Sequence, residues 1–348
     1  MKKTLLATTL AAFAFLNTAE ADVLSSINPI GFIVADLTKD VTPSSVLIPP
    51  TKSPHSAQLT PRDLTIIKDT DLLIYIDDDM EISLGKALEN DRIRPANVIE
   101  LASIPEIKKL LVKGVHHHHD DDHDHKHDHD HKHDHDHDHD HDHDHDHDHD
   151  HDHDHDHDHK HDHEHKKGSA HANEGLETNY HLWTSPRISK VVAQVIADKL
   201  IQIYPDKKDI INANLARFNQ ELDATNNEIK QVLVPSNLNN FYVFHDAYTY
   251  FEIDYGFRNK DKGAIYFNVN IEPSINQLNE LNKKAKEDNV KVIFSEPQFN
   301  RSIAEKLAKA IDAKLGLLDP LGVNIEVKPG SYQLFLKDLA NSFKILNK

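Results

Sequence analysis

The sequence contains no cysteine among its 348 residues. Disulfides are therefore excluded, and packed hydrophobic cores have to supply the stability. The lipid anchor of exported bacterial proteins also needs a cysteine directly after the leader, so we expect a soluble chain without a membrane anchor. Beyond the N-terminus, no apolar run reaches the roughly 20 residues that a membrane-spanning helix needs.

The sequence shows no stripe of lysine and arginine of the kind that binds nucleic acids. The formal net charge is −19 with histidine neutral. Most of this charge lies in residues 116–167, which include 21 acidic and 5 basic residues. The rest of the chain is nearly neutral, so the acidity is a local feature and nucleic acid is not an expected partner.

The segment 116–167, called the His/Asp tract below, also holds 26 of the 30 histidines. Histidine and aspartate alternate without a break from residue 133 to residue 159. Such a chain cannot bury enough apolar area to offset an ordering entropy of roughly 1–2 kcal/mol per residue. We predict a disordered loop over residues 116–179, inserted in a lobe because helical sequence resumes after it.

Residues 1–21 have the pattern of a secretory signal peptide. Lysines at positions 2–3 precede a 12-residue apolar core at 5–16, and "AEA" at 19–21 fits the small-x-small cleavage site. The order of charge, core and cleavage site favours a leader over a buried N-terminal helix. We therefore expect export to the periplasm of a Gram-negative cell and a mature chain that begins at Asp22.

The first folded region is predicted to be a parallel α/β lobe, because short apolar strands alternate with helices. The best local signal is a helix start, with Thr60 as the N-cap, Pro61 at the first helical position and Asp63 in the first turn. The expected strands are 23–27, 46–48, 71–76 and 97–101. The expected helices are 29–40, a helix that begins at Pro61, 81–90, 104–113 and 186–203.

A long helix is predicted in the middle of the chain, followed by a second α/β region. Ile210, Leu215, Phe218, Leu222 and Ile229 recur near a 3.6-residue period. The expected strands after this helix are 241–244, 264–269, 290–295 and 313–318, and the expected helices are 247–253, 274–288, 301–313 and 332–346. The predicted organisation is an N-terminal α/β lobe at 22–205, a linking helix at 206–232 and a C-terminal α/β lobe at 233–348.

Candidate binding residues follow the ends of separate strands. His55 comes after strand 46–48, His245 ends strand 241–244, and Asp319 follows strand 314–318. In open α/β sheets, ligands bind beyond the carboxyl ends of the strands, so these residues point to one crevice. His181 stands at a loop-to-helix junction just before Trp183, whereas His171 lies in the flank of the tract and carries little weight.

Three imidazoles and a carboxylate suit Zn²⁺, which takes about four ligands, whereas Mn²⁺ favours more oxygen. A single histidine at a strand end is more often a hydrogen-bonding residue than a ligand, so the metal hypothesis rests on the whole set. Trp183 and Tyr248 either line the crevice or simply pack between elements. Asp246 and Glu252 lie near His245 in the sequence, but neither can be assigned as a partner of its second ring nitrogen.

Several motifs, in this order, resemble one family. "SPHSAQLTPRDL", "HLWTSPR", "FHDAYTYF", "FSEPQF" and "LLDPLG" are similar to segments of the zinc-binding periplasmic component of metal ABC importers, the cluster A-I solute-binding proteins. The resemblance implies two doubly wound α/β lobes joined by one long helix, with the metal in the interlobe cleft. It also implies that His55, His181, His245 and Asp319 are the ligands, with water as an alternative to Asp319.

The resemblance implies a binding protein rather than an enzyme. It predicts periplasmic zinc capture by a monomer and delivery to an inner-membrane ABC permease with its ATPase. The His/Asp tract would then be a tethered, low-affinity zinc collector or sensor. Three alternatives remain open: a zinc storage or buffering protein, a manganese importer component, and a secreted zinc hydrolase, for which no HExxH motif is present.

Overall fold

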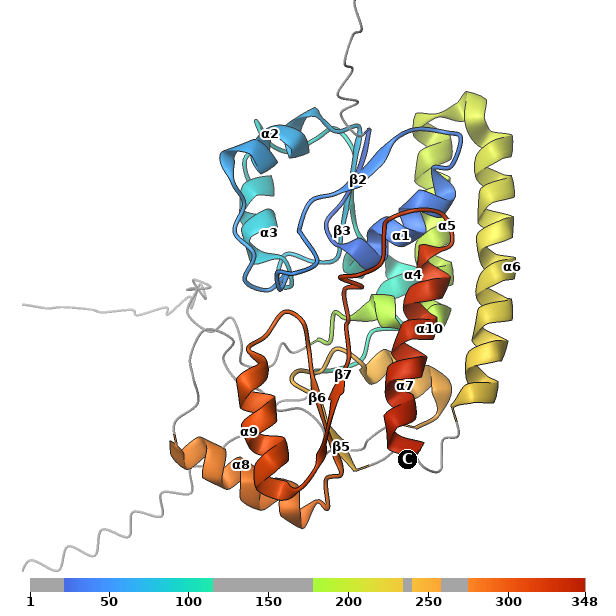
Figure 1. The fold of residues 1–348 in the computed structure, drawn as a ribbon. Helices are drawn as coiled ribbons and strands as arrows, with labels where there is room; N and C mark the ends of the chain where they lie inside the picture. The colour runs from blue at the N-terminus through green and yellow to red at the C-terminus, as the bar shows by residue number, and fades with distance from the viewer. Residues whose placement is uncertain (1–21, 115–177, 234–239, 258–274, 348) are drawn as a thin grey trace, which may run out of the picture. The chain divides into compact units, whose positions relative to one another are not determined.

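Two parallel β-sheets organise the part of the chain that the computed structural model describes, residues 22–114, 178–233, 240–257 and 275–347 (Figure 1). The first sheet has the strand order β2-β1-β3-β4 and the second the order β5-β6-β7. The strands are β1 (Val23–Ser25), β2 (Ser44–Val46), β3 (Leu72–Tyr75), β4 (Val98–Glu100), β5 (Phe241–Tyr242), β6 (Val292–Ser295) and β7 (Lys314–Leu317). The helices are α1 (Asn28–Leu37), α2 (Pro61–Asp69), α3 (Ile82–Leu88), α4 (Pro105–Lys108), α5 (Pro186–Ile203), α6 (Lys208–Val232), α7 (Thr249–Tyr255), α8 (Ile275–Glu287), α9 (Arg301–Ile311) and α10 (Ser331–Phe343).

Hydrophobic burial builds the first lobe around β1 and β3. Strand β1 pairs in parallel with β2 on one side and β3 on the other. All side chains of β1 and β3 are buried, as is typical of parallel strands that are covered on both faces. Helix α1 follows β1 with Pro29 in its first turn, as predicted, and every residue of α1 is buried.

The start of α2 has the cap that the sequence predicts. The Asp63 backbone N–H donates to the Thr60 hydroxyl oxygen over 3.3 Å, and the Thr60 backbone N–H donates to the Asp63 carboxylate over 2.7 Å. This reciprocal capping box satisfies two N–H groups that a helix start leaves without partners. It also fixes the point where the preceding loop ends, and that loop carries His55.

The second lobe is built around β6, which pairs in parallel with β5 and β7. Helix α9 packs on β6 and β7, and α8 packs on α9 (Figure 1). The buried residues of this layer form their own hydrophobic cluster, which includes Tyr242, Ile293, Ala304 and Leu307. The strand predicted at 264–269 lies outside the described residues.

Helix α6 is the long helix that the sequence predicts, with 25 residues, or about 37 Å at 1.5 Å per residue. It packs against α1, α5 and α10 (Figure 1). The buried face includes Ile211, Leu215, Phe218, Leu222 and Ile229. Ile210, which was predicted to belong to this buried face, is instead 38% exposed. Ile211 takes its place, because it lies four residues before Leu215 and therefore on the same face of the helix. None of the described helices is long and apolar enough to cross a membrane.

The described residues on either side of segment 115–177 contact each other. Lys113 and Thr178 form an isolated antiparallel bridge, and the Asn179 N–H donates to the Val112 carbonyl over 2.9 Å. The Tyr250 hydroxyl accepts from the Val112 N–H over 3.0 Å. These contacts hold the backbone of Val112 outside a helix, which explains why α4 ends at Lys108 instead of continuing to residue 113.

The predicted loop 116–179 includes two residues at its end, 178 and 179, that have defined contacts, whereas the His/Asp tract lies outside the described residues. The signal peptide, 1–21, lies outside them as well. The boundaries of the lobes and of the linking segment stay predictions.

Candidate metal centre

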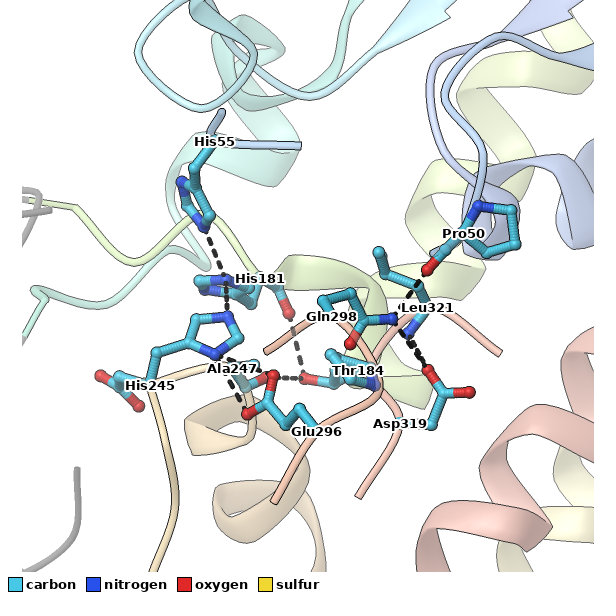
Figure 2. A network of polar contacts seen from close by, with 12 residues as sticks. Pro50, His55, His181, Thr184, His245, Ala247, Glu296, Gln298, Asp319 and Leu321 are labelled. Atoms are coloured by element: carbon cyan, nitrogen blue, oxygen red, sulfur yellow. Dashed lines mark hydrogen bonds and ion pairs between the residues drawn. The ribbon is translucent and has the colours of Figure 1, made fainter. Parts of the chain in front are cut away.

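Three histidines from separate parts of the chain converge on one point (Figure 2). His55 lies in the loop between β2 and α2, His181 lies just before a short 3-10 turn that leads into α5, and His245 follows β5. The His181 Nε2 atom lies 3.3 Å from the His55 Nε2 and 3.1 Å from the His245 Nε2. The candidate ligand atoms of all three residues lie within 4.8 Å of one another.

These separations fit a shared metal ion. Two Zn–N bonds of about 2.0–2.1 Å at a tetrahedral angle place their nitrogens about 3.3–3.4 Å apart. The two Nε2 separations of 3.1 and 3.3 Å are close to this value. The candidate ligand atoms of the third pair, His55 and His245, lie within 4.8 Å of each other, so binding one zinc ion through three Nε2 atoms requires only a shift of these side chains.

The ring of His181 is held by Asn179. The Asn179 Oδ1 atom lies 3.0 Å from the His181 Nδ1 and also accepts from the His181 backbone N–H over 2.9 Å. Because an amide oxygen only accepts hydrogen bonds, the His181 Nδ1 must carry the proton. The lone pair of His181 is then on Nε2, the atom that faces the other two histidines.

Glu296 does the same for His245. The His245 Nδ1 lies 3.1 Å from one Glu296 carboxylate oxygen and 3.0 Å from the other (Figure 2). The carboxylate accepts the Nδ1 proton and thereby directs the lone pair of Nε2 towards the shared point. Carboxylate–histidine pairs of this kind orient the ring and increase its basicity as a metal ligand.

Burial sets the charge of two of the three rings. It lowers the pKa of His55 to about 3, with a further contribution from the charge of His245. It also lowers the pKa of His181 well below its ordinary value. Both imidazoles are therefore neutral at physiological pH, which is the protonation state that binds metal.

The pKa of His245 is shifted upwards, whereas the pKa values of His55 and His181 are shifted downwards. Burial lowers its pKa, but the charge and hydrogen bond of Glu296, together with the charge of Asp246, outweigh burial and leave the pKa above the ordinary value. His245 is therefore the first of the three to take up a proton as the pH falls. A bound cation and this proton compete for the same ring.

Asp319, the fourth predicted ligand, is not part of the group that the three histidines form. Its carboxylate accepts from the backbone N–H groups of Leu321, Gly322 and Val323 at 3.1, 3.0 and 2.6 Å. It also accepts from the Gln298 side chain over 3.3 Å (Figure 2). In this structure Asp319 thus organises its own loop, and its role as a ligand stays a prediction.

Trp183 lines the pocket beside the histidines. Its ring centroid lies 5.1 Å from that of His181, and its indole N–H donates to the Pro320 carbonyl over 2.8 Å. Tyr248 is fully buried, and burial and the charge of Glu296 raise its pKa well above the ordinary value. Trp183 therefore belongs to the pocket wall, whereas Tyr248 is a buried neighbour of Glu296.

The sequence left three residues of this site unassigned: Asn179, Glu296 and Gln298. Glu296 directly follows β6, which pairs with β5, the strand that precedes His245. The residues that follow two paired parallel strands lie at the same edge of the sheet. The pairing of β5 with β6 was therefore the signal that could have placed Glu296 beside His245. Of the two acids near His245 in the sequence, Asp246 contributes its charge to the raised pKa of the ring, whereas the carboxylate that contacts Nδ1 is that of Glu296.

The family model described as the periplasmic component A of the zinc-uptake complex matches residues 23–345. The chain is 46% identical over 325 residues to the high-affinity zinc uptake system protein ZnuA of Haemophilus influenzae, covering 93% of this chain and 92% of that protein. It is 37% identical to the ZnuA of Haemophilus ducreyi, covering 98% and 97%.

Solved structures share the fold. A crystal structure of ZnuA matches with a TM-score of 0.64 at 24% identity, over 93% of this chain and 97% of that one. A zinc-bound ZnuA deletion mutant matches with a TM-score of 0.62 at 24% identity, over 93% and 96%. The predicted architecture of two α/β lobes and one long helix is confirmed by these likenesses.

Proposed function

We propose, since the chain belongs to the family of periplasmic component A proteins of zinc-uptake complexes, that it captures zinc in the periplasm with high affinity and passes it to an ABC importer. It is a solute-binding protein rather than an enzyme, as the family is. The zinc ion is its cargo. This family membership excludes the alternative that the chain is a secreted zinc hydrolase.

One observation carries the assignment of the site. The Nε2 atoms of three histidines face one point at separations of 3.1 and 3.3 Å, and the Nδ1 atoms of two of them are held by Asn179 and Glu296. Three imidazole nitrogens, two of them on rings whose Nδ1 is held by a hydrogen-bond partner, form a borderline nitrogen site, which suits zinc better than manganese. His55, His181 and His245 are the proposed ligands.

A tetrahedral zinc ion needs a fourth ligand in addition to the three histidines. Asp319 is the candidate that the resemblance implies, and water is the alternative. For Asp319 to ligate, its carboxylate would have to give up hydrogen bonds to Leu321, Gly322 or Val323, or its loop would have to move with it. A water molecule requires no such rearrangement.

The proposed partners follow from the transport role. A soluble zinc carrier needs a membrane permease to receive the ion and an ATPase to drive transport, so both are proposed partners of a monomeric chain. Cleavage of residues 1–21 by signal peptidase is proposed on the leader pattern of the sequence.

The His/Asp tract is proposed to collect zinc at many weak, exchangeable sites. It holds 26 histidines, and each binds metal weakly, because the flexible chain loses conformational entropy when it is ordered around the ion. Tethering places captured zinc at an effective concentration of order mM near the pocket. The chain enters and leaves the tract near Lys113 and Thr178, and Thr178 lies three residues before His181.

Deletion of residues 116–167 tests the transport function against zinc storage. We expect the shortened protein to lose most of its weakly bound zinc but to keep one tight site per chain, measured as zinc stoichiometry by isothermal titration. We also expect it to restore growth on low zinc to a cell that lacks its own zinc-binding component. Loss of growth together with loss of stored zinc would instead favour a storage protein.

Replacing Glu296 with glutamine should weaken zinc binding about tenfold, at the lower end of the effect of residues that hold a metal ligand. Glutamine can still accept a proton from the His245 Nδ1, but it no longer supplies the charge that makes the ring basic. Chelator competition with a protein that lacks residues 116–167 measures the affinity, because the histidines of the tract would otherwise mask the change. Glu280→Gln, on the exposed face of α8, is the matched control and should change nothing.

A further inference from the structure

Gln298 joins the second lobe to the loop that carries His55. It lies in the loop that follows β6, two residues after Glu296. Its Nε2 atom lies 2.8 Å from the carbonyl oxygen of Pro50, in the first lobe, and 3.3 Å from the Asp319 Oδ1 in the second lobe (Figure 2). Neither the resemblance nor the ligand set gives this residue a role.

The chemistry of the contact fixes the orientation of the amide. A glutamine side chain offers two N–H donors at its nitrogen, and the two neighbouring atoms, a carbonyl oxygen and a carboxylate oxygen, only accept. The nitrogen must therefore face Pro50 and Asp319. One side chain thereby satisfies an acceptor on each lobe at the same time.

The Pro50 end of the contact is connected rigidly to His55. The Lys52 N–H donates to the Pro49 carbonyl over 2.9 Å, and the Ala57 N–H donates to the Ser53 carbonyl over 2.9 Å. These two turns span the segment 49–57, which contains both Pro50 and His55. A contact that holds Pro50 consequently restrains the position of the His55 ring.

The Asp319 end is also fixed. Three backbone N–H groups of its own loop hold the carboxylate at 2.6 to 3.1 Å. The Gln298 amide therefore bridges two anchored acceptors instead of two mobile ones. Its hydrogen bond to Asp319 is charge-assisted, which makes it stronger than a bond between neutral groups.

We infer that Gln298 is an interlobe latch that holds the His55 loop, 49–57, against the second lobe and thereby slows the release of zinc. The inference rests on the proposed function and adds a positioning residue to it. Zinc leaves only after His55 moves away from His181 and His245. That movement requires the bond between Gln298 and Pro50 to break, so this bond contributes to the barrier for release.

Gln298→Met tests the latch, because methionine keeps the length and packing of the side chain but has no N–H donor. In the full-length protein loaded with half an equivalent of zinc, we expect release to excess chelator to be about three- to tenfold faster, the effect of one net hydrogen bond. Gln202→Met, an exposed position on α5, is the matched control.

A zinc-free measurement separates the latch from the proposed function. Amide hydrogen exchange in residues 50–57 should be faster in Gln298→Met than in the unaltered protein, even without metal. Equal exchange and equal release rates in the two proteins would overturn the latch while leaving zinc capture intact. If the unaltered protein bound no zinc tightly, the proposed function would fail, and the exchange measurement would still decide whether Gln298 restrains the loop.

Discussion

Replacing His245 with alanine in a protein that lacks residues 116–167 is expected to lower the affinity for zinc by about 100-fold or more. The substitution removes one of the three proposed nitrogen ligands and deprives the buried Glu296 carboxylate of its contact with His245, which is 3.0 Å long. The tract has to be absent because its 26 histidines would otherwise mask the loss. Competition against a chelator of known affinity measures the change.

The matched control is His171→Ala in the same shortened protein. His171 is the one histidine outside the tract that is not among the proposed ligands, so its removal should leave the affinity unchanged. His55→Ala and His181→Ala should each resemble His245→Ala, since all three rings share one point. Unchanged affinity in His245→Ala would remove this residue from the metal site.

Acidification is expected to weaken zinc binding to the shortened protein by about tenfold per pH unit once the pH lies below the pKa of His245. Glu296 holds this pKa above the ordinary value, so zinc has to displace a proton from His245. His55, with a pKa of about 3, and His181, with a pKa well below its ordinary value, are already neutral. The affinity therefore rises with pH and levels off above the pKa of His245.

The number of protons released per bound zinc ion checks both the direction and the steepness of this pH dependence of the affinity. Titration calorimetry in buffers of different ionisation enthalpy should give about one proton below about pH 6, because only one ring is charged before zinc binds. Three imidazoles with ordinary pKa values would release up to three. Glu296→Gln should shift the onset to lower pH, and a count of two or more protons in the unaltered site would contradict the assigned charges.

Local sequence signals predicted the fold well because each depends on few residues. Thr60 and Asp63 predict the start of α2, and Pro29 and Pro186 predict the first turns of α1 and α5. His55 and His245 follow strands of two different sheets, and their convergence was predicted because ligands bind beyond the carboxyl ends of the strands, in a crevice between the two lobes. Such signals do not depend on the contacts that the folded chain forms later.

The contacts around the histidines could not be predicted in the same way. Asn179 reaches His181 through a backbone arrangement that depends on Val112 and Tyr250, which are far away in the sequence. Asp319 lies after β7, as expected, but its carboxylate turns towards the N–H groups of its own loop. Which way a side chain turns at a strand end depends on the donors available after folding, and the strand pattern does not contain this information.

The position of Trp183 has an optical consequence. It is the single tryptophan of the chain, it is 1% exposed, and its ring centroid lies 5.1 Å from that of His181. All indole fluorescence of the protein therefore arises at the wall of the histidine pocket. A cation bound to His181 changes the electrostatic surroundings of this one fluorophore. The protein thus contains an intrinsic, dye-free reporter of the occupancy of its own binding site.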